Sequence, residues 1–245
     1  MFTWEIVAAD LNAVKMQARV RGVDSPRPTP YHHGDLRASL VEGAYQQLRA
    51  HGAEGVSLRS VAAAAGVSPS AAYHHFPDKT ALLLAVGDRA SEEFDASARA
   101  AWASVPGDDD AAVIARFEAL GEAYIDFAAA EPHLFRHKFG PLVAAAAFGT
   151  DGKGEANGEG PQPIDPDGAF GLLLRALHDL AARGLLRGGD AVGADLLAWS
   201  TVHGFAVLAM DGWMAPEARP ALFAAIHRVF IEGGPPAGPP VSPRP

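Results

Sequence analysis

The chain of 245 residues contains no cysteine. It can therefore form no disulfide, hold no metal through thiolates and carry no cysteine redox switch. This absence fits a reducing compartment, and we expect a cytoplasmic protein. Any ligand sensing has to be non-covalent or depend on histidine.

The sequence also lacks a long, uninterrupted apolar run. The longest one, residues 196–210, contains His203 and is bounded by Asp195 and Asp211. It is shorter than the roughly 20 apolar residues that span a bilayer, so we expect a buried helix and no contact with a membrane. Residues 1–16 carry acids where a signal peptide carries bases, which argues against secretion.

The patterns of common catalytic and cofactor sites are missing as well. His133 and His137 have helical i, i+4 spacing, but Glu131 precedes them, whereas a zinc-protease helix places its general-base glutamate between the two histidines. The glycines of residues 149–168 follow no strand pattern, so they do not form a nucleotide-binding loop. We predict no catalytic residue, no metal site and no cofactor. An all-α enzyme is the alternative from a different class of protein.

The net charge of −9 is unevenly distributed. Residues 1–80 hold eight Lys/Arg and seven Asp/Glu, a balance of about +1, together with half of the ten histidines. Residues 81–245 therefore carry about −10. Only the first third of the chain is electrostatically compatible with the phosphates of a nucleic acid.

The sequence of residues 56–79, VSLRSVAAAAGVSPSAAYHHFPDK, indicates two short helices joined by a glycine turn. Ser57 can cap the first helix, and Gly66 supplies the turn. Ser68 and Pro69 provide a side-chain cap and a preset first turn for the second helix. This pattern is typical of a helix-turn-helix, whose second helix enters the major groove of DNA.

We expect the two helices over residues 58–65 and 69–75. Small and apolar residues would hold them at a fixed angle, namely Val56, Leu58, Val61, Ala62, Ala65, Val67 and Ala72. Polar residues of the second helix would point outward, namely Ser70, Tyr73, His74 and His75. A helical hairpin without a role in nucleic-acid binding is the structural alternative.

The run YHHFPDKTALLLAV, residues 73–86, with AAAAGVSPSAA before it, closely resembles the DNA-binding domain of the tetracycline-repressor (TetR) family of bacterial regulators. The resemblance covers about residues 35–89. It implies a DNA-binding transcriptional regulator that works as a dimer.

The resemblance also implies contacts for individual residues of the second helix. Ser70 and Ala71 would face base edges, and Ala71 would suit a thymine methyl group. Tyr73 matches the phosphate-contacting tyrosine of the family, while His74 and His75 would divide between bases and phosphate oxygens. A capping or packing role is the alternative for His75, and a packing role is the alternative for Tyr73.

Two basic residues outside that helix complete the implied DNA-binding set. Lys79 matches a phosphate contact of the family, and a lysine beside the positive end of a helix is itself unfavourable unless an anion is near. Arg59 would reach a phosphate or a guanine.

Helical periodicity continues along the chain. We predict helices at about residues 35–51, 79–103, 110–131, 132–139, 167–183, 190–214 and 216–231. Asp78 can cap the helix over residues 79–103. No strand pattern or internal repeat is present, so the predicted fold class is all-α. It combines an N-terminal three-helix, helix-turn-helix DNA-binding domain with a larger C-terminal helical domain for ligand binding and dimerisation.

The predicted domain organisation has four parts. Residues 1–34 form a flexible arm, 35–89 the DNA-binding domain, 90–232 the ligand-binding and dimerisation domain, and 233–245 a disordered tail. A flexible loop is expected at residues 149–168.

The N-terminal arm contains scattered arginines, Arg19, Arg21 and Arg27. Such an arm would lie in a minor groove or on phosphates. An unstructured leader, or a start at Met16, is the alternative.

The C-terminal part carries a second resemblance. Trp199, His203 and Gly204 in AWSTVHGFAVL, with EPHLFRHKFG at residues 131–140, look like the TetR subgroup named for its Trp-His-Gly motif. A cavity for an unknown, mostly hydrophobic small-molecule effector would be lined by Phe117, Tyr124, Phe127, Phe135, Phe139, Trp199 and His203. The alternative is that these side chains only fill the core.

A homodimer is expected because a single reading head contacts too few base pairs to find its site in a genome. Its operator on double-stranded DNA would be an inverted repeat. The last two helices would form the dimer faces through Ala198, Val202, Ala206, Ala209, Leu222, Ala225 and Val229.

The resemblance therefore implies a repressor that binds a palindromic operator and is released when an effector moves the bridging helix over residues 79–103. In the alternative, the head still binds DNA, but the C-terminal domain only dimerises or docks a protein.

Overall fold

The computed structural model describes residues 33–148, 164–187 and 193–231. Within these ranges the chain forms α-helices and two short 3-10 helices, without a β-strand. The prediction of an all-α fold is confirmed. Residues 1–32 of the predicted arm, most of the predicted loop over 149–168, and the predicted tail over 233–245 lie outside the described residues.

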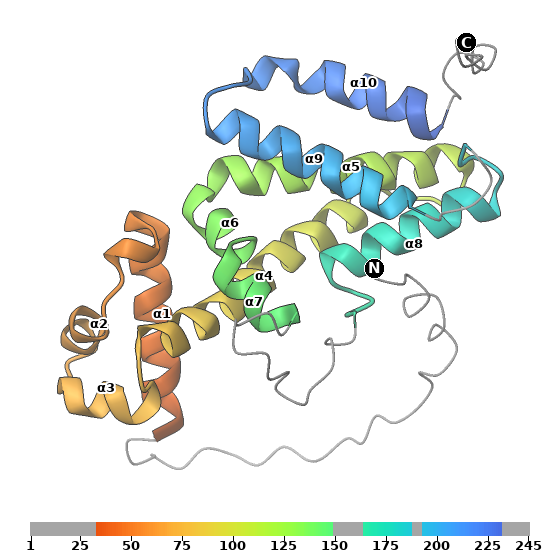
Figure 1. Cartoon of the computed structure of the whole chain (residues 1–245). Coiled ribbons are helices and arrows are strands. Elements are labelled where there is room, and N and C mark those ends of the chain that lie inside the picture. The colour runs from red at the N-terminus through yellow and green to blue at the C-terminus, as the bar shows by residue number, and fades with distance from the viewer. Residues whose placement is uncertain (1–32, 149–163, 188–192, 232–245) are drawn as a thin grey trace, which may run out of the picture. The chain divides into compact units, whose positions relative to one another are not determined.

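Three helices make up the N-terminal head (Figure 1). They are α1 (His33–His51), α2 (Leu58–Ala64) and α3 (Pro69–His75). Helix α1 takes in the last two residues assigned to the arm, and ends before Gly52, whose φ of 71° is left-handed. Leu40, Leu48 and Val61 are fully buried between the three helices.

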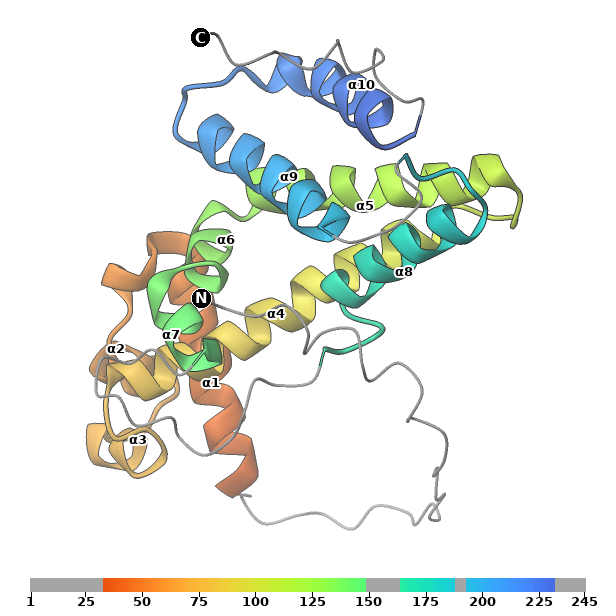
Figure 2. The ribbon, with the colours of Figure 1, turned by 45° about the vertical axis from the view of Figure 1, so that its right-hand side comes forward.

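Helix α4 (Lys79–Ala103) runs without interruption from the head into the C-terminal helices (Figures 1 and 2). Asp78 caps it as expected, because its Oδ1 accepts from the amide of Ala81 at 2.8 Å. Its buried stripe includes Leu82, Val86, Ala90 and Phe94. Helix α4 packs against α1 in the head and against α5, α6 and α8 beyond it, so one rigid element belongs to both parts.

The C-terminal part is built around α5 (Asp110–Ala130). Helices α8 (Ala169–Ala182) and α9 (Ala194–Met210) pack on α5. Helix α10 (Arg219–Phe230) reaches α5 through Phe230, whose ring lies 5.4 Å from that of Phe117. Figure 2 shows α5, α9 and α10 stacked on one another.

Two short helices connect α5 to the segment before α8. The expected one is α6 (Pro132–Lys138), and the other is α7 (Pro141–Phe148), which the sequence did not indicate. The sequence of α7, PLVAAAAF, is apolar on every side and has no amphipathic period to reveal it.

The predicted ends of the later helices were partly wrong. Helix α9 ends at Met210 and not at residue 214, because Gly212 has a φ of 76° and the amide of Trp213 donates back to the carbonyl of Leu208 at 2.9 Å. Helix α8 begins at Ala169, two residues later than predicted. A 3-10 turn (Pro216–Ala218) precedes α10.

Helix α9 is not the fully buried helix that its composition suggested. Leu196, Leu197 and Leu208 are 47%, 49% and 42% exposed. The side that does face inward carries three residues predicted for the dimer interface, and Ala198, Val202 and Ala206 are buried within the subunit. Those three assignments are therefore wrong, since a side chain enclosed by its own subunit cannot also form the contact face of a dimer.

None of the described helices is long and apolar enough to cross a membrane.

Candidate nucleic-acid interface

Side-chain caps fix both helices of the helix-turn-helix. The hydroxyl of Ser57 accepts from the amide of Ser60 at 3.1 Å, and that of Ser68 accepts from the amide of Ala71 at 3.2 Å. Each cap satisfies an amide that has no partner within its helix. Gly66 has a φ of 70°, and this left-handed residue turns the chain from α2 towards α3.

The apolar set predicted for this motif lies inside the head. Val56, Leu58, Val61, Ala62 and Ala72 are buried, and Ala65 and Val67 are half-buried. Helix α3 is therefore held against α2 along one side, and its other side is left for contacts outside the chain.

The predicted base-reading and phosphate-contacting residues of α3 differ in exposure. Ser70, Tyr73 and His74 are exposed, with Tyr73 47% accessible. Ala71 and His75 are half-buried. Three of the five predicted side chains are thus accessible to a DNA partner, whereas Ala71 and His75 are only partly accessible.

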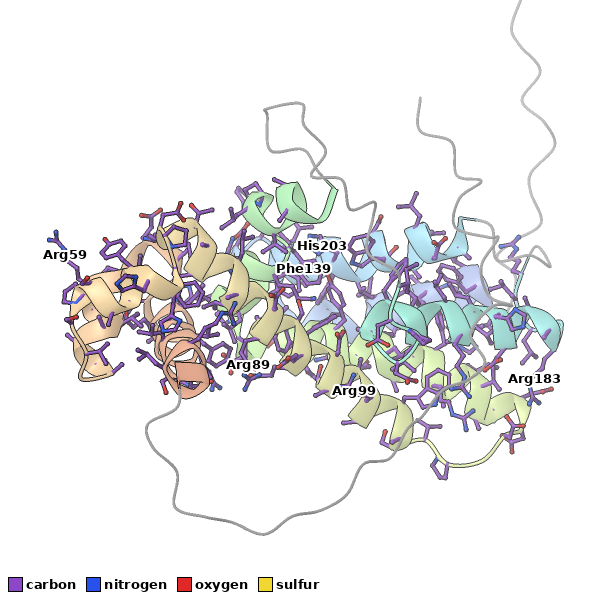
Figure 3. All side chains as sticks on the ribbon, turned by 90° about the horizontal axis from the view of Figure 1, so that it is seen from below. Arg59, Arg89, Arg99, Phe139, Arg183 and His203 are labelled. Atoms are coloured by element: carbon purple, nitrogen blue, oxygen red, sulfur yellow. The ribbon has the colours of Figure 1, made fainter. Side chains whose placement is uncertain are left out.

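A shallow depression of about 300 Å³ brings together three predicted residues from separate helices, Arg59, Tyr73 and Lys79. The depression is also lined by Ser57, Leu58, Pro77 and Asp78. Lys79 Nζ lies 3.5 Å from the backbone oxygen of Glu54, so a carbonyl occupies only one of its three donors. Figure 3 shows Arg59 extending outward at the edge of the head.

Arg37 is a further cation near α3 that the sequence analysis missed. Its exposed guanidinium lies 5.1 Å from the ring centroid of Phe76, the residue that follows α3. No local pattern in α1 carries this signal, because the contact joins α1 to the residue that follows α3.

In the C-terminal part, five of the seven predicted ligand-binding residues meet in one aromatic cluster. The cluster consists of Tyr124, Phe135, Phe139, Trp199 and His203, whose rings lie 4.8 to 6.3 Å from one another in contacting pairs. Figure 3 places Phe139 and His203 close together between α6 and α9.

The other two predicted residues lie differently. Phe127 joins the cluster only through Phe94, whose ring centroid is 5.2 Å away, and Phe117 pairs with Phe230 on α10. Phe94 and Phe170 also contact residues of the cluster and were not predicted, because these contacts join helices far apart in the sequence.

A chain of hydrogen bonds runs through the aromatic cluster. Trp199 Nε1 donates to the Tyr124 hydroxyl at 3.2 Å, and this hydroxyl lies 2.7 Å from His203 Nδ1. Since the hydroxyl already accepts from Trp199, its proton is available for the Nδ1 of neutral His203. Burial lowers the pKa of His203, which favours that neutral form, and burial also raises the pKa of Tyr124 above its usual range.

Helix α6 connects this cluster to the head through two polar contacts. The buried carboxylate of Glu131, just before α6, accepts from Arg49 of α1 through both guanidinium nitrogens that face it, with Nε at 2.7 Å. His137 Nε2 lies 2.8 Å from the carbonyl oxygen of Leu83 in α4, to which it donates. Helix α6 is therefore fastened to both helices that carry the helix-turn-helix.

The His137 contact bears on the question of metal binding. One ring nitrogen of His137 is already engaged by a backbone carbonyl, and burial lowers the pKa of this histidine. Within residues 33–148, 164–187 and 193–231, no three histidines or carboxylates are grouped so that they could hold a metal ion.

The N-terminal head has three helices and exposes the polar side of α3, and the long helix α4 connects it to the C-terminal helices. This arrangement is that of a helix-turn-helix DNA-binding regulator. Comparison with known families makes the class specific. The family described as "Bacterial regulatory proteins, tetR family" matches residues 40–86, and "Tetracyclin repressor-like, C-terminal domain" matches residues 117–230. The chain belongs to the TetR family, which confirms the resemblance seen in the sequence.

Two curated relatives match part of the chain. The HTH-type transcriptional regulator CymR of Pseudomonas putida is 37% identical over 76 residues, which cover 31% of this chain and 37% of the relative. The HTH-type transcriptional regulatory protein RaaS of Mycobacterium tuberculosis is 43% identical over 67 residues, which cover 27% of this chain and 31% of the relative. The chain thus matches about a third of the length of these relatives.

Solved structures extend the similarity over most of the chain. A protein of unknown function from Rhodococcus sp. RHA1 is 29% identical with a TM-score of 0.61, covering 82% of this chain and 97% of that one. A TetR family transcription regulator from Marinobacter aquaeolei VT8 is 18% identical with a TM-score of 0.50, covering 80% and 95%, a likeness that shows the fold alone.

Family membership makes the chain a DNA-binding transcription regulator and not an enzyme. The Trp-His-Gly subgroup, the individual DNA-binding residues and the domain boundaries at 34/35, 89/90 and 232/233 stay predictions.

Proposed function

We propose that the chain is a ligand-responsive transcriptional repressor, which binds a palindromic operator as a homodimer in the bacterial cytoplasm and is released by a small, mostly hydrophobic effector. The observation that carries the proposal is the outward presentation of Ser70, Tyr73 and His74 on α3, beside Arg59 and Lys79.

In this proposal the head reads DNA through two kinds of contact. Ser70, Ala71 and His74 reach base edges in the major groove, where hydrogen bonds and methyl contacts carry sequence information. Tyr73, His75 and the cations around the depression contact phosphates, which fixes the register of α3 without selecting bases. Arg59 reaches a phosphate or a guanine.

The homodimer is supported by a stripe of leucines and small residues along one side of α9. Leu197, Thr201, Gly204 and Leu208 recur at intervals of four, three and four residues, so they share one face of the helix. Nothing in the described chain lies within 4 Å of a Cβ placed on Gly204, which leaves room for a second helix to approach. We define these four residues as the α9 stripe.

Helix α10 adds positions predicted from the sequence. Val229 is 47% exposed, and Leu222 and Ala225, at the same helical face, are half-buried. Together with the α9 stripe they form the proposed contact with a second copy in a four-helix arrangement.

The effector site is proposed at the aromatic cluster. Aromatic rings offer a large apolar contact area, and the hydrogen-bonded chain of Trp199, Tyr124 and His203 provides the few polar groups that orient a ligand. The rings are packed on one another, so an effector has to displace some of them.

Helix α6 would transmit the effect of binding. Phe135 stacks on His203 with centroids 5.4 Å apart, and the same helix is fastened to α1 and α4 by Glu131 and His137. A ligand that separates His203 from Phe135 therefore shifts the helices that set the position of α3. To change the ratio of the released form to the DNA-binding form from 1:99 to 99:1, the effector has to bind the released form more strongly by about 5.5 kcal/mol.

A second candidate keeps the DNA-binding dimer but gives the C-terminal domain no ligand. The close packing of the aromatic cluster favours it, since these rings fill the core in the structure as it stands. A small molecule that binds the isolated protein and releases DNA decides between the two.

The proposal is tested by nuclease footprinting on the DNA upstream of the gene that encodes the chain, followed by a screen of compounds related to neighbouring gene products. We expect two protected half-sites in inverted orientation, and loss of protection with at least one compound. Protection of no DNA fragment, or sedimentation as a monomer at micromolar concentration, contradicts the proposal. Protection that no compound removes supports the second candidate.

A further inference from the structure

Lys138, the last residue of α6, is a cation placed at the aromatic cluster. Its ammonium lies 5.1 Å from the ring centroid of Phe94 and 5.4 Å from that of Phe139. The side chain is half-buried, and burial lowers the pKa of its ammonium. A cation kept in this position has lost part of its hydration.

The chain compensates this charge only in part. Lys138 Nζ donates to the hydroxyl of Ser91 at 2.8 Å. In the described ranges no carboxylate oxygen lies within 4.0 Å of it. An ammonium has three donors, so two remain for acceptors other than Ser91.

The carboxylate that acts on Lys138 from a greater distance is Asp95. It favours the charged ammonium, but its influence is smaller than that of burial. Asp95 is also committed elsewhere, because its Oδ1 accepts from the amide of Ala169 at the beginning of α8 at 2.9 Å. The ammonium therefore faces the cluster with a neighbour of opposite charge, but without an ion pair.

The cluster is connected to the protein surface through Phe170. Phe139 contacts Trp199, and Trp199 contacts Phe170 with centroids 5.9 Å apart. Phe170 is 36% exposed. The rings of Phe170, Trp199 and Phe139 thus form a continuous row of contacts from the surface to the ring that the ammonium contacts.

We propose that Lys138 is the anion-binding group of the effector site, and that the effector is a monocarboxylic acid with an aromatic or aliphatic body. The inference rests on the proposed effector function and specifies its ligand class. The carboxylate accepts from the two remaining donors of Lys138, while the apolar body displaces rings of the cluster. One cation with a carboxylate nearby suits a single negative charge, whereas phosphate groups are usually bound by several cations or by arginine forks.

The position of Lys138 on α6 also connects a carboxylate bound there to the head. Lys138 belongs to the helix whose other polar groups, His137 and the preceding Glu131, hold α4 and α1. A carboxylate that draws the ammonium away from Ser91 thus acts on the element that fixes the reading head.

The test uses the full chain and three acids, each paired with its own primary amide: phenylacetate, cinnamate and octanoate. Binding is measured by calorimetry, and release of footprinted DNA is measured in parallel. We expect at least one acid to bind and to release DNA, with affinity about tenfold or more above its amide, because the charged hydrogen bonds are lost in the amide.

Two charge variants have opposite expected effects. Lys138→Met keeps the apolar stem and removes the charge, so the preference for the acid over the amide disappears. Asp95→Asn keeps an oxygen that can cap α8 and removes the carboxylate that competes for the ammonium. At a pH low enough to keep Lys138 protonated without Asp95, the acids therefore bind more tightly to this variant. Thermal unfolding of both variants verifies that they fold, and the sign of the Asp95→Asn effect tests the inference independently of Lys138→Met.

Several results would overturn the inference. They are binding of none of the acids, equal binding of acids and amides, or a preference for acids that persists in Lys138→Met or weakens in Asp95→Asn. If amides release DNA as well as acids do, the effector function stands and the role of Lys138 falls. If the chain protects no DNA but binds acids through Lys138, the repressor proposal falls and the anion site stands.

Discussion

Arg59, Tyr73 and Lys79 come from three helices and line one depression on the head. Their grouping suits a phosphate, because two cations and a hydroxyl are within reach of one anion. Each would then contribute to affinity for any DNA sequence, whereas Ser70 and His74 on the exposed side of α3 would contribute to selection among sequences.

Lys79→Ala should weaken binding to all DNA sequences alike. One lost phosphate contact releases about one fewer counterion, so the magnitude of the slope of log K against log salt should fall by about 0.9 per head. Fluorescence anisotropy over a range of salt concentrations measures this slope. Arg187→Ala is the matched control, since it removes an exposed cation that follows α8 and lies outside the proposed DNA-binding and effector sites. An equal change in both variants would remove Lys79 from the interface.

Ser70→Ala and His74→Ala should change base preference at one position of each half-site. A lost bidentate base contact costs about 1 to 3 kcal/mol of discrimination, and the single bond of a serine hydroxyl lies at or below the lower end. Competition binding with a set of singly substituted operators measures the change. Uniform weakening across all operators would instead assign these side chains to phosphates.

Residue positions could be predicted from the sequence where they depend on local structure, and not where they depend on packing between helices. The caps Ser57, Ser68 and Asp78 need only a neighbouring amide, and all three were predicted. Phe117 was predicted to line the effector cavity, but its ring pairs with that of Phe230 on α10. No local pattern distinguishes these two outcomes.

At the scale of elements, the turn of the helix-turn-helix depends on the backbone of Gly66. A Cβ there would contact nothing within 4 Å, but its φ of 70° is left-handed. Gly66→Ala should therefore reduce the free energy of unfolding by about 1 to 2 kcal/mol through strain alone. Gly43→Ala in α1 is the control, because its Cβ would lie at an ordinary 3.5 Å from Val61 Cγ1 in a helical backbone.

Urea unfolding of both glycine variants measures these effects. Gly43→Ala should be neutral or slightly stabilising, since alanine favours a helix interior more than glycine does. If Gly66→Ala were as stable as the parent, the left-handed conformation of the turn would be disproved.

The junction of α6 and α4 should weaken in acid. The pKa of His137 is lowered by burial, so the unfolded chain binds a proton more readily than the folded one. The contribution of His137 to the free energy of unfolding is fully present above pH 6.5, its pKa in the unfolded chain. This contribution is lost as the pH falls from 6.5 towards the lower pKa of His137 in the folded chain. His203 has a lowered pKa for the same reason and adds to the loss.

His137→Gln should make this loss shallower, because glutamine can still donate to the Leu83 carbonyl but does not titrate. Urea unfolding at about pH 7.5 and about pH 5.5 measures the difference. His178→Gln, at an exposed histidine of α8, serves as the control. Equal pH dependence in the parent and His137→Gln would show that the buried histidine does not contribute.

Every α-helix of the described residues except α7 was predicted, from periodicity or, for α2 and α3, from caps and a glycine turn. The uniform apolar composition of α7 hides its period. Helix ends were less predictable. The end of α9 depends on the left-handed conformation of Gly212, and a glycine in the sequence permits that conformation without requiring it.

At the scale of the whole molecule, the sequence predicted dimer faces on α9 and α10, and three of the residues predicted on α9 are buried within the subunit. Composition showed that α9 is rich in small and apolar residues, yet which of them face α5 depends on the packing of α5. The α9 stripe, in which Leu197 and Leu208 are exposed and Thr201 and Gly204 are half-buried, could be recognised only from the burial of each residue in the structure.

Leu208→Asp should dissociate the proposed dimer, because a carboxylate would be buried against an apolar helix without a partner. The mass by sedimentation equilibrium should fall to that of one chain, and operator affinity should fall with it. Ile164→Asp, at a residue that is 45% exposed and outside α9 and α10, should change neither. A dimer that survives Leu208→Asp would place the interface elsewhere.

The most direct test of the DNA-reading role is selection of genomic fragments by the purified chain, followed by footprinting of the enriched DNA with the parent and with Tyr73→Ala. We predict enrichment of an inverted repeat with half-sites about 34 to 36 Å apart, or a multiple of that distance, and loss of protection in the variant. Enrichment without a repeat, or protection unchanged by Tyr73→Ala, would contradict the assignment of α3 as the recognition helix of a two-fold DNA reader.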